Sequence, residues 1–165
     1  MFKVSFKEES KKTQVFNGKA TLVTLVGEMK MPTEVWRAFP DDVAHWMWGH
    51  QGVDVQWGNC TRTQEAFILE ITGKSVCAEG DIFNAEVGQR IAESRVKIKL
   101  YKFMHNLCES LMKYYYDIMY GNAEFDVIRE SHTEAPKDCL YLTCKKYREL
   151  WIKESHHLGE LLKKT

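Results

Sequence analysis

A long amphipathic helix, predicted over residues 81–121, constrains the fold of this chain more than any other sequence feature. Apolar side chains recur through it at steps of three and four residues, which places them on one helix face. The stripe consists of Ile91, Ile98, Leu100, Met104, Leu107, Leu111, Tyr115 and Ile118. Asn84 is the expected N-cap, because its side-chain oxygen can accept a bond from a free N–H of the first turn. The pair Gly121-Asn122 is the expected end.

Residues 1–80 are predicted to be mainly strands, because apolar and polar side chains alternate there with a period of two. The first strand is expected to stop at the polar run 8–13. The dipeptide Asn17-Gly18 predicts a turn, and the longer strand after it is expected to end at Pro32. Further strands are predicted at residues 53–57 and 65–77.

A second helix is predicted over residues 136–163, where Leu140, Tyr147 and Trp151 fall roughly on one side. It is expected to pack antiparallel to the long helix. Strands come first and helices last, which predicts an α+β fold. The expected architecture is a small antiparallel sheet packed against a long helix and a C-terminal antiparallel helix, with residues 1–165 forming a single domain.

Residues 33–51 form an aromatic-rich insert between the strands. Two interpretations remain open for this segment. It can be a core plug over the sheet, which is the commoner arrangement, or a partner-binding surface, since aromatic clusters are enriched in binding hot spots. In the second interpretation, the partner-binding residues are Trp36, Phe39, Trp46, Trp48 and, from the last helix, Trp151.

The charge and composition argue for an ordinary intracellular protein. The 23 basic and 23 acidic residues give a net charge of zero, whereas a general binder of nucleic acid or membrane surfaces is usually basic. No apolar run approaches the roughly 18 residues of a membrane span, and the first residues lack the apolar core of a signal peptide. The five cysteines form an odd set, which argues against a secreted disulfide framework. We therefore expect a cytoplasmic protein with no membrane partner.

Motifs for catalysis, metal binding and cofactor binding are absent from the sequence. It contains no G-x-S-x-G, H-E-x-x-H or phosphate-binding G-x-x-x-x-G-K-[ST] motif. Neither Cys-x-x-Cys nor His-x-x-x-His occurs. We therefore predict no catalytic residue, no metal site and no cofactor.

The passage from the last strand into the long helix resembles a signature of short, uncharacterised phage and prophage proteins. In that signature a strand leads through a turn to F-D-x-x-x-G and then to a helix that reads K/R-[LI]-A-x-x-R. The residues that match in order are Cys77, Asp81, Phe83, Asn84, Gly88, Arg90, Ile91, Ala92 and Arg95. Asn84 replaces the usual Asp, and the usual Pro of the turn is absent. The resemblance implies an origin in a phage or other mobile element.

Two main functional hypotheses follow from these observations. The first is a non-enzymatic phage or mobile-element protein that binds a host protein or protein–nucleic-acid complex in the bacterial cytoplasm, for example to inhibit a defence system such as a CRISPR effector. The alternative is a nucleic-acid-binding accessory protein that uses the basic start of the long helix, although a solvated helix face also explains these charges. The residues of this alternative are Arg90, Arg95, Lys97 and Lys99. A homodimer formed through the long helix is a third reading.

Overall fold

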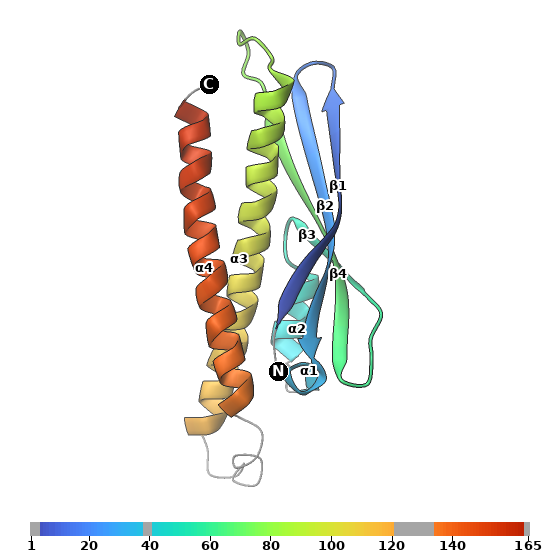
Figure 1. Cartoon of the computed structure of the whole chain (residues 1–165), viewed down its shortest axis with the longest axis vertical. Helices are drawn as coiled ribbons and strands as arrows, with labels where there is room; N and C mark the ends of the chain where they lie inside the picture. Colours follow the sequence, from blue (N-terminus) through green and yellow to red (C-terminus); the bar gives the residue numbers. More distant parts are fainter. Residues whose placement is uncertain (1–3, 38–40, 121–133, 164–165) are drawn as a thin grey trace.

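The structure is a computed structural model that describes residues 4–37, 41–120 and 134–163, with backbone alone at residues 34, 37, 42, 115–120 and 134–139 (Figure 1). The strands are β1 (Ser5–Phe16), β2 (Ala20–Pro32), β3 (Val53–Trp57) and β4 (Gln64–Val76). The helices are α1 (Thr33–Arg37), α2 (Asp41–Trp48), α3 (Ala85–Tyr120) and α4 (Glu134–Lys163). The strands form one four-stranded antiparallel sheet in the order β1-β2-β4-β3. The predicted α+β fold is confirmed.

α3 lies along one face of the sheet, and α4 runs antiparallel beside α3 (Figure 1). The inner face of the sheet is apolar because alternate residues of β2 and β4 point toward α3. Its buried members include Val23, Leu25, Met29, Phe67, Leu69 and Ile71. They share one hydrophobic core with Ala92, Val96, Leu100 and Phe103 of α3, and with Leu140, Cys144 and Tyr147 of α4.

Local signals fixed two boundaries correctly. Asn84 caps α3, and its Oδ1 accepts a bond from the Val87 N–H at 3.1 Å. Asn17 and Gly18 have φ values of 48° and 59°, the positive values that a type I′ hairpin turn requires. Both predictions are confirmed, because a cap and a tight turn depend on short-range chemistry.

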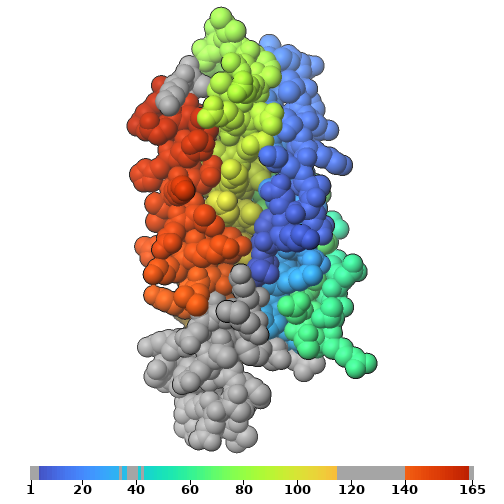
Figure 2. All heavy atoms as spheres, viewed as in Figure 1, coloured from blue at the N-terminus to red at the C-terminus, as the bar shows by residue number. Residues whose placement is uncertain are grey.

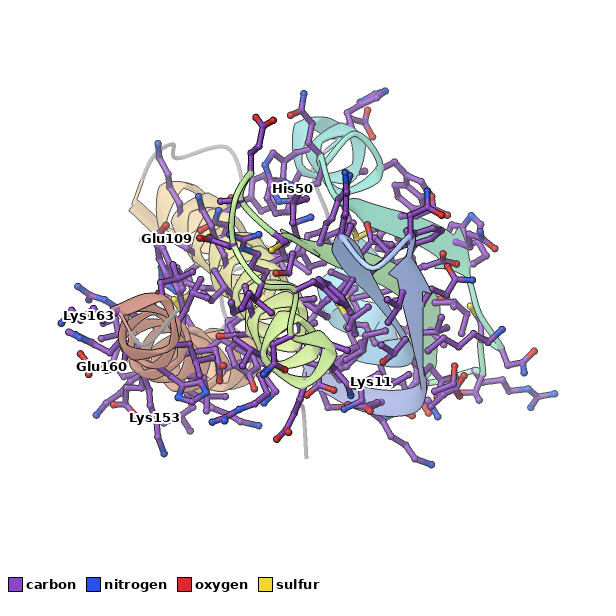
Figure 3. The ribbon with its side chains drawn as sticks, turned by 90° about the horizontal axis from the view of Figure 1, so that it is seen from above. Lys11, His50, Glu109, Lys153, Glu160 and Lys163 are labelled. Carbon is purple, nitrogen blue, oxygen red and sulfur yellow. The ribbon has the colours of Figure 1, made fainter. Side chains whose placement is uncertain are left out.

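The prediction that β1 ends at the polar run 8–13 is wrong. β1 continues to Phe16 and pairs with β2 along its whole length. It is an edge strand with mostly exposed side chains, so its backbone pairs without an apolar alternation. Lys11, inside this run, reaches toward α3, where its Nζ lies 2.9 Å from Glu93 Oε1 (Figure 3).

A β-bulge interrupts β1 opposite Gly27. The register shifts between Glu8 and Ser10, whereas the pairing of β2 with β4 is unbroken at Gly27. A Cβ atom at Gly27 would collide with the ring of Phe6. The glycine therefore makes room for a side chain from the bulged strand.

Among the residues described, no helix combines the length and apolar content needed to cross a bilayer.

Candidate functional site

Three tryptophans from separate elements meet around the buried ring of Phe67 in β4. We call Trp36 of α1, Trp48 of α2 and Trp57 of β3 the tryptophan cluster. Their ring centroids lie 5.8 Å (Trp36–Trp48), 5.3 Å (Trp36–Trp57) and 5.5 Å (Trp48–Trp57) apart. Each ring is also 5.0 to 5.9 Å from the ring of Phe67. These spacings are those of favourable aromatic pairs, so the rings hold one another in place.

The cluster is partly exposed. Trp48 is 39% exposed and Trp57 is 55% exposed, whereas Phe67 is fully buried and Trp36 is partly buried against the core. Two large rings therefore stand at the surface on a packed aromatic base. Ring packing of this kind restricts side-chain rotation, which lowers the conformational entropy lost on binding. Exposed, rigid tryptophans are the side chains most enriched in protein-binding hot spots.

The other predicted partner-binding residues lie elsewhere. Trp46 stacks on Phe103 of α3, with centroids 5.4 Å apart and planes at 16°, and so attaches α2 to the core. Trp151 packs near His105, and Lys102 Nζ lies 5.7 Å from its ring. Phe39 lies outside the described residues. Within the aromatic insert, Trp46 thus packs against the core and Trp48 lies at the surface, and its role in partner binding stays a prediction.

Trp57 is the member of the cluster that the sequence did not single out as a candidate binding residue. Its alternation with Val53 and Val55 predicted one shared inward face. The two valines are buried, but Trp57 ends the strand at the margin of the core and is exposed. Its partner across the strands is Phe67, an aromatic pair that would have revealed the cluster. That pairing depends on strand register, which the sequence alone does not show.

A pocket with two carboxylates in its lining and the Lys99 ammonium at Thr72 adjoins the cluster at Trp48. This edge pocket has a volume of about 350 Å³ and is lined by Trp48, His50, Asp54, Glu70 and Thr72, among others. Asp54 and Glu70 lie directly opposite each other on β3 and β4. Gln56 Nε2 donates to Asp54 Oδ2 at 3.0 Å, but no Lys or Arg within the described part of the chain forms an ion pair with either carboxylate. Like charges placed opposite each other favour a cation between them.

His50 lines the edge pocket and lies beside α2 (Figure 3). Its ring packs on Trp46 at 4.7 Å and on Phe103 at 5.4 Å. Burial lowers the pKa of His50, and the charge of Lys102 lowers it further. The imidazole is therefore held in its neutral form more firmly than in the unfolded chain.

Lowering the pH from 7 to 5 is expected to reduce the free energy of unfolding through His50. The unfolded chain takes up this proton near its ordinary pKa of 6.5, whereas folded His50 does so only at lower pH. Below pH 6.5 the unfolded state therefore binds more protons than the folded state. The contribution of His50 to the free energy of unfolding is retained above pH 6.5 and falls as the pH drops below it. Urea unfolding at pH 7, 6 and 5 should show a smaller fall for His50→Gln than for the wild type. His157→Gln, at an exposed position, should keep the wild-type slope; equal slopes for all three proteins would contradict the assignment.

The basic residues at the start of α3 do not form one stripe. Arg95 Nη1 donates to the Lys74 carbonyl, and Lys99 Nζ donates to the Thr72 carbonyl at 2.6 Å. Lys97 Nζ instead lies 3.9 Å from Glu154 on α4, and Arg90 is exposed. Two of the four charges thus bond to the sheet. The nucleic-acid alternative stays a prediction, without a shared basic surface to support it.

Arg95 and Lys99 cap an open edge of β4. β3 pairs with β4 only as far as Ile71, so beyond that residue the described chain places no strand on this side. The two cations donate to carbonyls that could otherwise accept N–H groups of another strand. The sequence could not show these bonds, because it does not reveal how far β3 extends along β4.

A thiol, an imidazole and a carboxylate lie in line between α3 and α4. Cys144 Sγ is 3.1 Å from His105 Nδ1, and His105 Nε2 is 4.0 Å from Glu109 Oε2. Burial raises the pKa of the Cys144 thiol, and the charge of Glu109 raises it further. Burial therefore favours the protonated thiol, whereas nucleophilic catalysis requires a thiolate. His105 Nδ1 also lies 3.3 Å from the Cys144 carbonyl oxygen. The described residues contain no group of three or more His, Cys, Asp or Glu that could hold a metal ion.

The tryptophan cluster and the edge pocket together form the candidate functional site. Both lie at the surface, and both include Trp48 of α2 and residues of β3 and β4. The arrangement offers apolar contact and negative charge side by side, which is the chemistry of recognition. No family model, no curated protein and no solved structure matches this chain.

Proposed function

We propose that this chain is a non-enzymatic binding protein that docks on a host protein through the tryptophan cluster. The observation that supports the proposal most directly is the exposure of Trp48 and Trp57 on a rigid aromatic base. Burying two such rings removes a large apolar area from water at little entropic cost. The cluster would therefore supply most of the binding free energy.

The edge pocket indicates which side chains the partner surface would carry. Asp54 and Glu70 have no cationic partner among the described residues, and Trp48 lines the same pocket. A Lys or Arg of the partner would form ion pairs with both carboxylates and a cation–π contact with the indole ring of Trp48. The proposed partner surface therefore has a basic side chain beside an apolar one. Such basic surfaces are typical of proteins that bind nucleic acid.

The phage-like resemblance of residues 77–95 gives the proposal its biological setting. A mobile-element protein that covers a basic, nucleic-acid-binding surface would block the host protein that owns it. We therefore propose an inhibitor of a bacterial defence system, with a CRISPR effector as the specific target class. The inhibition would come from occupying the surface and would need no chemical step.

The double variant Trp48→Ala/Trp57→Ala tests this function. Purified CRISPR effector complexes are titrated with the wild-type chain in a calorimeter, and host interference is scored by phage plaque counts. The variant should bind at least roughly 30-fold more weakly and should restore interference, because each hot-spot residue contributes about 2 kcal/mol or more. Tyr141→Ala, at an exposed position on α4, is the matched control and should bind like the wild type. Wild-type affinity in the folded double variant would refute the role of the cluster.

The variant Asp54→Asn/Glu70→Gln separates the acidic contribution from the aromatic one. It keeps the shape of the edge pocket and removes its charge. Weaker binding and a loss of salt dependence are expected, because the ion pairs with the partner disappear. Unchanged salt dependence would show that the partner presents no basic group to this pocket.

A further inference from the structure

The end of the molecule where α3 begins is unusually apolar. Figure 2 shows the first turns of α3 at this end, between the β1–β2 hairpin and the end of α4. Exposed large apolar side chains gather on the elements that end or begin here, and we call them the apolar end. They are Val15, Phe16, Val76, Ile82 and Leu162. Contiguous exposed apolar side chains on a soluble protein indicate a contact surface.

A pocket of about 400 Å³ opens within the apolar end. This junction pocket lies between the end of β4, the first turns of α3 and the last turn of α4. Its apolar wall comes from Val76, Phe83, Val87, Ile91 and Leu162. The pocket is therefore able to bury an apolar side chain supplied from outside.

Ile82 belongs to the lining of this pocket, yet 96% of its surface is exposed. The loop that presents it is held by its own bonds. The Asp81 N–H donates to the Ala78 carbonyl at 3.2 Å, and the Cys77 thiol donates to the Asp81 carbonyl at 3.5 Å. Gly80 takes the positive φ of 93° that this turn needs. The fold thus holds a large apolar side chain in water next to an apolar hollow.

The charges at the junction pocket are of both signs. Asp81 and Arg95 both line it. Arg95 donates one N–H to the Lys74 carbonyl. A guanidinium has five N–H donors, so others remain for a further acceptor. This surface carries a protruding apolar side chain (Ile82), an apolar pocket, an anion and a cation close together, so two copies of it can complement each other. Self-complementarity is what a two-fold symmetric contact requires.

We propose that the chain forms a two-fold symmetric dimer in which each Ile82 enters the junction pocket of the second copy. Asp81 of each copy then faces Arg95 of the other. This contact uses the start of α3 and the apolar end, and it leaves the tryptophan cluster free, since α1 and α2 lie toward the opposite end of α3 (Figure 1). The dimer would present two tryptophan clusters and double the contact with a symmetric or repeated target.

Sedimentation velocity of the full chain, over a hundredfold range of concentration, tests the dimer. The wild type should sediment as a dimer, and Ile82→Asp should sediment as a monomer with a dissociation constant raised at least roughly 30-fold. Ile82 is so exposed that its replacement should leave the far-UV circular dichroism unchanged. Ile152→Asp is the matched control, because Ile152 is also exposed but lies away from the apolar end; this variant should remain a dimer.

Two results would overturn the proposal. One is a wild-type monomer throughout the concentration range, and the other is an Ile82→Asp variant that still dimerises. The double variant Trp48→Ala/Trp57→Ala should remain a dimer, so loss of partner binding and loss of dimerisation are measured independently. Dissociation of that double variant would place the contact at the tryptophan cluster and would also refute the junction contact.

Discussion

Gly73→Ala should lower the free energy of unfolding by roughly 2–4 kcal/mol, the cost of overpacking a tight contact. Gly73 lies in β4 directly under α3. A Cβ atom there would overlap the Ala92 carbonyl oxygen and come within 2.8 Å of the Val96 side chain. Because the first obstacle is helix backbone, α3 would have to move away from the sheet. Urea unfolding followed by circular dichroism measures the loss.

Gly159→Ala is the matched control for this prediction. Gly159 lies in α4 with nothing within 4 Å of its added Cβ. Alanine should therefore stabilise the protein by about 0.5–1 kcal/mol, because glycine is unfavourable inside a helix. A shift in the same direction for both variants would show that close packing at Gly73 is not what decides the outcome.

Phe67→Ala should cost roughly 3–5 kcal/mol of stability, as for other fully buried aromatic side chains. Phe67 is fully buried and lies under all three rings of the tryptophan cluster. Its loss would leave a cavity in the core and would also free the rings above it. Chemical unfolding measures the first effect, and a red shift of tryptophan fluorescence in the native state measures the second.

The control for Phe67→Ala is Tyr141→Ala. Tyr141 is an aromatic residue of α4 with more than half of its surface exposed. Its removal should change the stability by no more than about 0.5 kcal/mol. A native fluorescence spectrum unchanged by Phe67→Ala would mean that the tryptophan rings hold their positions without the buried base.

The sequence predicted the parts of this fold that depend on short-range chemistry. The N-cap at Asn84 and the turn at Asn17-Gly18 need only local bonds, and both are present. The inward face of β4 followed from a simple alternation of apolar residues. β1 was cut short because alternation reports burial, and an edge strand pairs through its backbone without being buried.

The candidate site was less predictable because its members come together through tertiary contacts. The sequence singled out Trp36 and Trp48 but grouped them with Trp46, which stacks on Phe103 in the core. It did not single out Trp57, whose exposure depends on how far the helices cover the sheet. The opposition of Asp54 and Glu70 likewise depends on strand register, which no single stretch of sequence contains.

The two cations that cap β4 also determine where α3 can sit. Arg95 and Lys99 are four residues apart on α3, a rise of about 6 Å, and their acceptors Lys74 and Thr72 are two residues apart on β4, about 6.6 Å. The two spacings agree, with the chains running in opposite directions. If α3 slid by one turn, one of the two cations would face the other's carbonyl, and the remaining carbonyl would lose its donor. The pair therefore favours one longitudinal register of the helix on the sheet, in addition to the close contact at Gly73.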